Sequence, residues 1–335
     1  MTTGLGFAVL AALCQGVFFL PTAKMRDWKW EHFWLAFAAT GMIVGNWILA
    51  LILLPSPLAI YAAVPRQEIV TLVCFGVAWG VSAVMFGMGM DMLGMTLGYP
   101  LMMGLNASVG TVIPLFWFSG HAALGTSGAI ILGGTAVAIA GIAVCSVAGA
   151  RKATAGQEKH SASRSRFVTG LIVAIASGIL SCLPNIGLAY ATGTLQQARA
   201  LGASPAFAAD SVWLLFFTCG GLVNVLYCLF LTIRNGNTRA LVDAQHAGNW
   251  FWGLLMGAFW IASFYLYGIS TARMGTAGAS IAWPVFIALS IGVGVLCGLG
   301  KGEWKGASRK AKVLLWEGLA LIALAVILIP LGNRH

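Results

Sequence analysis

The sequence predicts an all-α integral membrane protein with ten transmembrane helices, arranged as two inverted five-helix repeats. Composition is the first observation: 59% of the 335 residues are apolar, only 8% are charged, and the mean hydropathy is +0.90. The second is that long apolar runs follow one another along the whole chain, and the third is that one stretch occurs twice. A water-soluble globule of this composition would expose more apolar surface than water tolerates, so we place the chain in a bilayer.

The individual spans follow from the length of helix that a bilayer requires. Crossing about 30 Å of hydrocarbon takes roughly 20 apolar residues in an α-helix. Ten runs of the sequence meet this requirement. We predict spans at residues 3–22, 33–54, 69–90, 94–117, 127–149, 168–190, 210–233, 249–270, 277–299 and 313–331.

The repeated stretch lies near residue 76 and again near residue 257. A duplicated helical unit in a hydrophobic chain is typical of transporters built from two related halves, so the repeat favours a solute carrier. The alternative is that the repeated residues record only shared helix packing, which is equally plausible for each glycine alone. Gly76, Trp79, Ser82, Gly87 and Gly94 recur 181 positions later, as Gly257, Trp260, Ser263, Gly268 and Gly275. Trp34, Leu35, Phe37, Gly41 and Val44 recur 179 positions later, as Trp213, Leu214, Phe216, Gly220 and Val223.

The basic residues predict the orientation. Of the 19 lysines and arginines, 15 fall in the loops after odd-numbered spans, so the positive-inside rule places both termini outside the cytoplasm, in the periplasm if the membrane is a bacterial inner membrane. The longest charged loop, 150–167, is predicted to be a cytoplasmic linker between the repeats 1–149 and 168–335. Because each repeat has an odd number of spans, the second inserts upside down relative to the first.

We expect span one to be a retained helix, since no basic residue precedes it and no cleavage site follows it.

Composition also argues against several function classes. The net charge of +10 sits in short loops rather than on one helix face, so we expect no nucleic-acid partner. The seven cysteines lack the spacing of zinc or redox motifs, and we expect no metal and no cofactor. A membrane enzyme acting on lipid is an alternative of a different class, but it needs a cluster of catalytic side chains. The five histidines are scattered over separate loops and ends, so we expect no catalytic residues and no enzyme activity.

Neutral polar and aromatic side chains in mid-span are the candidates for solute binding. A polar group there is costly unless it is paired or lines a cavity. Amides and hydroxyls beside aromatic rings suit a neutral polyhydroxyl solute, because they exchange hydrogen bonds while a ring covers its C–H face. For any one residue, a structural role is about twice as plausible. The predicted substrate-binding residues are Gln15, Trp79, Tyr99, Asn106, Asn185, Asn224, Trp260, Ser263, Tyr267 and Trp283.

Three acids are candidates for proton coupling. Glu317 lies about one turn inside the predicted tenth span, where it either carries a proton or extends toward nearby lysines, and the second interpretation is favoured. Asp91 follows the third span. Asp210 opens the seventh, where a role as helix N-cap would suffice to explain it.

Several spaced motifs resemble the bacterial L-rhamnose/proton symporter family, within the drug/metabolite transporter superfamily. The resemblance covers nearly the whole chain and implies a ten-helix inner-membrane carrier that takes up L-rhamnose or a related sugar with a proton. Compared with the rhamnose carriers of that family, span three has fewer amides around Ser82 to Met85, and Ser263 stands where span eight has an amide. The motifs are Lys24-Met-Arg-Asp-Trp28-Lys-Trp30-Glu31 with Trp34, Ala78-Trp79-Gly80 with Gly87, Leu93-Gly94-Met95 with Gly98, Gly104, Gly110, Thr111 and Pro114, and Asn224, Trp260, Tyr267, Trp283 and Glu303-Trp304.

The functional hypothesis is therefore a secondary active transporter that imports a neutral sugar by proton symport with alternating access. Its expected partners are the sugar, the coupling proton and the lipid bilayer. The alternative is a carrier of another small metabolite on the same scaffold, importing or exporting, and coupled to protons, to sodium or to neither. Substrate competition distinguishes the two.

Overall fold

The described part of the chain is entirely helical in its regular structure. The computed structural model describes residues 2–93, 95–118, 125–154, 164–275, 278–300 and 304–331, and no strand occurs within these ranges. Eight helical segments among the described residues are long and apolar enough to cross a membrane, and two shorter apolar helices, Leu101–Trp117 and Ile281–Cys297, accompany them. These findings agree with an integral membrane protein.

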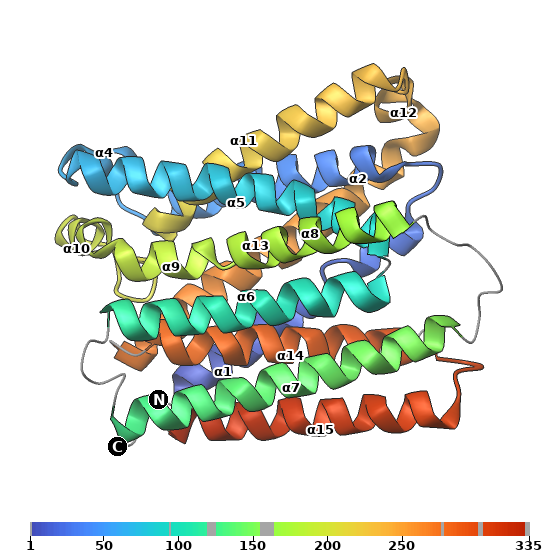
Figure 1. Ribbon diagram of the computed structural model, residues 1–335. Helices are drawn as coiled ribbons and strands as arrows, with labels where there is room; N and C mark the ends of the chain where they lie inside the picture. The colour runs from blue at the N-terminus through green and yellow to red at the C-terminus, as the bar shows by residue number, and fades with distance from the viewer. Residues whose placement is uncertain are drawn as a thin grey trace.

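Helices occur at all ten predicted positions, in the order shown in Figure 1. In the first half they are α1 (Thr2–Val17) with η1 (Leu20–Lys24), α2 (Trp30–Phe37), η2 (Ala38–Gly45), α3 (Asn46–Leu53), α4 (Pro57–Ala62), α5 (Arg66–Leu93), α6 (Met95–Phe118) and α7 (Thr126–Thr154). In the second half they are α8 (Arg164–Leu180), α9 (Leu183–Tyr190), α10 (Thr192–Ala200), α11 (Asp210–Arg234), α12 (Arg239–Val242), η4 (Ala244–His246), α13 (Ala247–Met274), α14 (Gly278–Gly300) and α15 (Arg309–Leu331).

Three of the predicted spans are interrupted, which hydropathy did not predict. The first is α-helical only to Val17 and ends in the 3₁₀ helix η1. The second is α-helical at both ends but has π-helical geometry over η2, between Phe37 and Asn46. The sixth stops at Leu180 and restarts as α9, with Pro184 in the first turn, where its missing N–H costs no helical hydrogen bond. Interruptions of this kind are common where a membrane protein binds a solute.

Two short helices, α4 and α10, lie together at one end of the bundle and were also not predicted (Figure 1). The carboxylate of Glu68, in the first turn of α5, receives hydrogen bonds at the start of α10. The backbone N–H of Thr194 donates to Oε1 at 2.7 Å, its hydroxyl donates to the same oxygen at 2.6 Å, and the N–H of Gly193 donates to Oε2 at 3.1 Å. A carboxylate is favourable at a helix N-terminus, so Glu68 fixes α10 against α5.

The repeated glycines make reciprocal contacts between the two halves. A Cβ on Gly41 would lie 2.6 Å from the Cα of Gly257, and a Cβ on Gly220 would lie 2.8 Å from the carbonyl oxygen of Gly76. Gly41 and Gly220 occupy the same repeat position, as do Gly76 and Gly257. Backbones approach this closely only where side chains are absent, which is the usual way for helices to pack in a bilayer.

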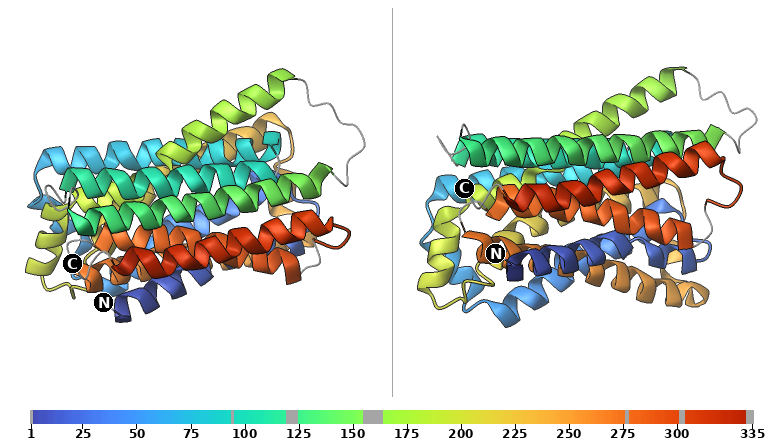
Figure 2. Two further views of the ribbon diagram at one scale, coloured as in Figure 1. Left: turned by 60° about the horizontal axis from the view of Figure 1, so that its bottom comes forward. Right: turned by 90° about the horizontal axis from the view of Figure 1, so that it is seen from below.

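Whole helices pack reciprocally as well. α1, from the first half, packs against α13 and α14, while α8, from the second half, packs against α5 and α6. α7 and α15 run side by side along one flank of the bundle, and all views agree on this (Figures 1 and 2). The start of α1 and the end of α15 lie at the same end of the bundle (Figure 2).

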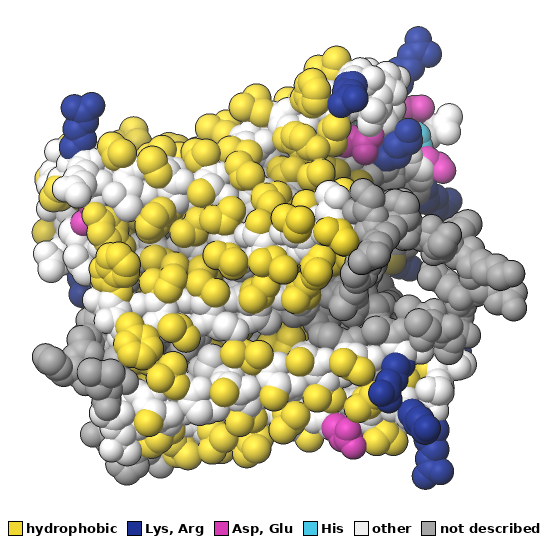
Figure 3. Space-filling view, in the orientation of Figure 1, with side chains coloured by type: hydrophobic (Ala, Val, Ile, Leu, Met, Phe, Trp, Pro, Cys, Tyr) yellow, Lys and Arg dark blue, Asp and Glu magenta, His cyan; other side chains and the backbone are white. Residues whose placement is uncertain are grey.

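The surface separates apolar and charged side chains along the bundle. In Figure 3, hydrophobic side chains cover the middle of the visible face, while Lys and Arg gather toward its two ends. Many large apolar side chains are exposed on the helices, including Leu51, Ile52 and Leu226. Such a surface suits a bilayer rather than water.

Candidate functional site

A cavity lies between helices of both halves. It contains about 590 Å³ of space unfilled by protein atoms, counting the part open to solvent. Its walls come from α1, α2, η2, α5, α6, α13, α14 and the break between α8 and α9. Nine aromatic residues line it, together with four aliphatic and three neutral polar ones: Phe18, Trp34, Phe37, Trp79, Phe86, Trp260, Phe264, Trp283 and Phe286; Met42, Ala83, Met103 and Ile287; Gln15, Asn106 and Ser181.

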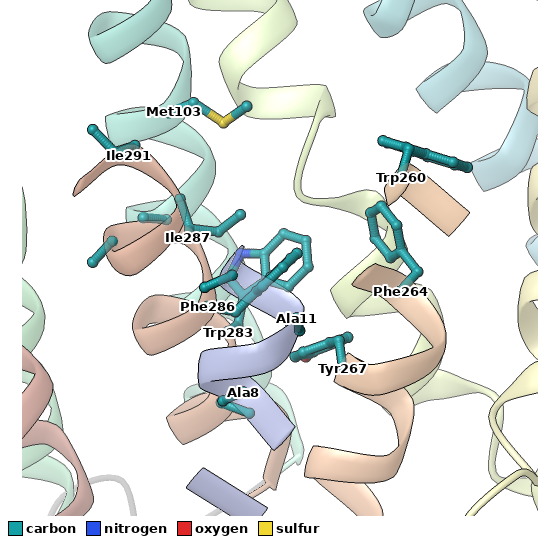
Figure 4. Packing of buried hydrophobic residues seen from close by; sticks show 14 of the residues in the cluster. Ala8, Ala11, Met103, Trp260, Phe264, Tyr267, Trp283, Phe286, Ile287 and Ile291 are labelled. Carbon is teal, nitrogen blue, oxygen red and sulfur yellow. The ribbon is translucent and has the colours of Figure 1, made fainter. Parts of the chain in front are cut away.

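Two tryptophans that are repeat copies of each other form one wall. The rings of Trp79 and Trp260 are stacked, with centroids 5.7 Å apart and an interplanar angle of 25°. Trp283 and Phe286 of α14 lie opposite Phe264 and Trp260 of α13, as Figure 4 shows. The indole N–H of Trp283 donates to the carbonyl oxygen of Asn106 at 3.2 Å, so this ring is held by α6.

The polar groups of the cavity are few and differ in their hydrogen bonding. Gln15 of α1 accepts a 2.7 Å hydrogen bond at Oε1 from the Ser263 hydroxyl, which leaves its amide nitrogen without a hydrogen bond among the described residues. Asn106 of α6 makes only a long contact from Nδ2 to the sulfur of Met103, 3.8 Å, and its buried Oδ1 has no partner in the described part of the chain. Buried polar atoms are nearly always paired, so the Oδ1 atom of Asn106 is the best candidate in the cavity lining for a hydrogen bond to a ligand.

Four other predicted substrate-binding residues lie outside the lining and support it. The hydroxyl of Ser263 donates a hydrogen bond to Gln15, as described above. Asn224 accepts a 2.9 Å hydrogen bond from the indole of Trp34 and donates to the carbonyl oxygens of Gly80 and Gly220. Asn185 donates to the carbonyl oxygens of Gly110 (2.6 Å) and Ala279 (3.3 Å) and accepts from the hydroxyl of Tyr267. Tyr267 is fully buried and stacks on Phe286 at 5.3 Å. The amides of Asn185 and Asn224 are thus used inside the protein. The remaining predicted residue, Tyr99, has a side chain outside the described set.

The three acidic candidates differ sharply in their surroundings. Glu317 is exposed on α15, a helix that does not contribute to the cavity. The side chain of Asp91 lies outside the described set. Asp210 is fully buried at the first residue of α11, and neither of its carboxyl oxygens has a hydrogen-bond partner among the described residues.

The interpretation of Asp210 as a helix N-cap was wrong. Ala209 is the N-cap of α11, and the Asp210 side chain caps no backbone N–H of this helix. The next residue, Ser211, accepts a 2.6 Å hydrogen bond at its carbonyl oxygen from the hydroxyl of Tyr61 in α4. Burial raises the pKa of the Tyr61 hydroxyl, so it remains protonated and keeps α4 against the start of α11.

Several lining residues were not among the predicted site residues. Trp34 was the most accessible of them to sequence reasoning, because it belongs to the repeat and follows the motif that carries the family resemblance. Phe37 belongs to the repeat as well. Phe18, Phe86, Phe264 and Phe286 carried no such signal, since phenylalanine occurs equally in helix contacts and in cavity walls.

The sequence comparisons decide the family. The family model described as L-rhamnose-proton symport protein (RhaT) matches residues 1–334. The chain belongs to this family. It is 26% identical over 339 residues to a protein of Cronobacter sakazakii named L-rhamnose-proton symporter, covering 99% of this chain and 98% of that protein. Proteins of the same name from Escherichia coli O1:K1 / APEC and Salmonella newport are 25% identical over 344 residues and 26% identical over 341 residues. The match to the Escherichia coli protein covers 100% of this chain and 99% of that protein. The match to the Salmonella newport protein covers 99% of this chain and 98% of that protein.

Membership in the L-rhamnose-proton symport protein family makes this a chain of a transporter family, and it gives the cavity a context. A symporter must bind its solute between helices that can rearrange, and the cavity lies between helices of both halves. No side chain in its described lining carries a formal charge. A lining of this kind suits a neutral solute with an apolar face.

Proposed function

We propose that this chain imports L-rhamnose or a related deoxysugar together with a proton, across the inner membrane of a bacterium. The main support for this proposal is the cavity, which combines aromatic walls with a small number of neutral polar groups. Stacked tryptophans can cover the C–H face and the methyl group of a deoxysugar, while Gln15 and Asn106 exchange hydrogen bonds with its hydroxyls. Family membership and the names of the relatives support the same solute.

The transport mechanism in this proposal is alternating access between two inverted five-helix halves, 1–149 and 168–335, with ten spans in all and both termini in the periplasm. Three observations support it. Helices lie at all ten predicted positions, the repeated glycines contact one another reciprocally, and Trp79 stacks on its own repeat copy, Trp260. A residue meets its own copy only close to the axis that relates two halves. The chain's place in the drug/metabolite transporter superfamily is part of the proposal.

For the proton we propose Asp210 as the carrier, in preference to Glu317 and Asp91. An ionised carboxylate that is buried without a partner is costly, so protonation and deprotonation of Asp210 must change how its surroundings pack. The carboxylate of Glu317 already has access to the surface and would gain little from such coupling.

The deciding experiment is uptake of labelled L-rhamnose into proteoliposomes, with and without an inward proton gradient. We expect saturable accumulation stimulated by the gradient, and inhibition by unlabelled deoxysugars. The Asp210→Asn variant should lose the stimulation yet still exchange internal for external sugar, whereas Glu317→Gln should behave as the wild type. Gradient-stimulated uptake by Asp210→Asn would contradict the role of this residue.

One observation favours a second candidate function, transport of another small metabolite. Among the described residues, three amide or hydroxyl side chains line the cavity, fewer than the hydroxyl groups and ring oxygen of a hexose would occupy. If the folded protein takes up no rhamnose, the melting temperature of the purified protein should be measured with each of a panel of less polar solutes. A solute that raises it is a candidate substrate.

A further inference from the structure

The start of α2 and the start of α11 carry the same short motif. Glu31 stands three residues before Trp34, and Asp210 stands three residues before Trp213, with the acids and the tryptophans both separated by 179 positions. The two motifs lie at opposite ends of α11. Glu31 contacts residues just beyond the last residue of α11, whereas Asp210 is its first, and a helix of 25 residues is about 38 Å long.

Their neighbours in space also correspond. Trp30, just before Glu31, lies where a Cβ on Gly87 of α5 would clash with its ring. Ala209, just before Asp210, lies 2.8 Å from where a Cβ on Gly268 of α13 would be. Gly87 and Gly268 are repeat copies. The motif of α2 therefore packs against α5 at the same repeat position at which the motif of α11 packs against α13.

In the first half, the acid and the tryptophan of the motif each have a hydrogen-bond partner. Oε1 of Glu31 accepts hydrogen bonds from Asn235 at 3.0 Å and Asn237 at 2.8 Å. The indole N–H of Trp34 donates to Asn224, and the ring of Trp34 is a wall of the cavity.

In the second half, the same groups have none. Both carboxyl oxygens of Asp210 and the indole nitrogen of Trp213 are buried without a hydrogen-bond partner among the described residues. Both side chains are fully buried, and Trp213 stacks on Phe217 at 5.2 Å instead of lining the cavity. Three unpaired polar atoms in one motif are destabilising, so use of these groups in another state of the protein would explain why they are kept.

We propose that the two motifs exchange roles during transport, so that Trp213 becomes a wall of the solute cavity, and Asp210 gains polar partners, when the carrier opens to the opposite side of the membrane. The inference rests on the proposed alternating access of two inverted halves, in which each half adopts the arrangement that the other had before. It assigns Trp213 as a solute-contacting residue of the opposite-facing state, and Trp34 as its counterpart in the state described here.

The first test compares Trp34→Phe with Trp213→Phe, a matched pair of repeat-related changes that keep an aromatic ring. Trp34→Phe should lower the melting temperature and weaken equilibrium binding of L-rhamnose, since it removes a satisfied hydrogen bond and alters a cavity wall. Trp213→Phe should leave the melting temperature unchanged and the affinity for L-rhamnose within about twofold of the wild type. It should slow solute exchange by roughly tenfold, the effect of disturbing a well-packed aromatic contact. Unchanged exchange in Trp213→Phe, or losses of stability and binding equal to those of Trp34→Phe, would overturn the proposal.

The second test measures access directly and does not depend on the identity of the solute. A cysteine is placed at position 34 or at position 213 of a chain whose seven natural cysteines have been replaced, and a membrane-impermeant maleimide is added to either face of vesicles. Position 34 should react from one face and position 213 from the other. Failure of position 213 to react from either face contradicts the exchange of roles. Protection by L-rhamnose tests the proposed solute separately, because access without protection would refute only the sugar.

Discussion

Trp79 and Trp260 stack on each other in the wall of the cavity, with ring centroids 5.7 Å apart, although 181 residues separate them in the sequence. Each is surrounded by rings from α11: Trp79 lies 5.2 Å from Phe217, and Trp260 lies 4.8 Å from the same ring. A pair of repeat copies therefore forms the centre of the aromatic cluster. The cavity walls on either side of this pair depend on hydrogen bonds that can be tested one at a time.

The first of these bonds joins Asn224 to Trp34. Replacing Asn224 by Leu leaves the indole N–H of Trp34 unpaired, while the carbonyl oxygen of Gly80 keeps its helical hydrogen bond within α5 and loses only the second one from Asn224. Each buried polar group left without a partner costs about 1–3 kcal/mol, so the free energy of unfolding should fall by about 2 kcal/mol or more. Binding of L-rhamnose, measured by calorimetry on the purified protein, should weaken because Trp34 loses its orientation.

Asn249→Ala provides the control for this change. Asn249 exchanges two hydrogen bonds with the backbone of Arg26, outside the cavity lining. Its loss should lower the melting temperature while rhamnose affinity stays the same. Equal affinities for the Asn224→Leu variant and the wild type would show that Asn224 has no part in positioning the cavity wall.

The second bond joins Ser263 to Gln15. Ser263→Ala should reduce sugar affinity roughly fivefold, since the lost hydrogen bond is worth about 1 kcal/mol and Gln15 becomes free to rotate. Gln15→Ala should reduce affinity further. Because Ser263 acts through Gln15, the double variant should bind no more weakly than Gln15→Ala alone. Additive losses would mean that Ser263 acts independently of Gln15.

The helices could be predicted from the sequence, but their irregularities could not. Hydropathy windows register how apolar a segment is, and all ten predicted positions are helical. The π-helical geometry of η2 coincides with the approach of Gly41 to Gly257, and the break before α9 comes just before Pro184. The short helices α4 and α10 depend on the Glu68 carboxylate of a distant segment. None of these features changes the average hydropathy of a span.

For the site, the kinds of residue could be predicted but not their orientation. Gln15 and Asn106 line the cavity, whereas Asn185 and Asn224, which carry the same amide group and are also buried, point into helix contacts. A helix that is apolar on all sides has no hydrophobic face from which its rotation can be read. Trp34 was missed for the same reason. Only three-dimensional packing separates the residues that face the cavity from those that support them.

Close approach of the two halves at Gly41 leads to the third prediction. A Cβ on Gly41 would meet backbone atoms of Gly257, at 2.6 Å from Cα and 3.0 Å from the carbonyl oxygen, so α13 would have to move. Gly41→Ala should therefore lower the free energy of unfolding by about 1–3 kcal/mol, the usual cost of overpacking. Gly6→Ala is the control, because no atom lies within 4 Å of a Cβ at that position. Thermal unfolding of the two variants in detergent should differ clearly, and equal melting temperatures would contradict the contact.

The Oδ1 atom of Asn106 is buried and unpaired in the part of the chain that the structure describes. Asn106→Leu removes this unsatisfied acceptor, so the solute-free protein should become more stable by about 1 kcal/mol. The same change should abolish measurable sugar binding, because the unpaired oxygen is available to a solute hydroxyl. Asn185→Leu is the matched comparison: it leaves the carbonyl of Gly110 and the hydroxyl of Tyr267 without partners and should destabilise the protein by about 2 kcal/mol. A gain in melting temperature joined to a loss of binding at position 106 is what a polar group kept for its ligand produces, whereas a loss of stability like that at position 185 would make Asn106 a structural residue.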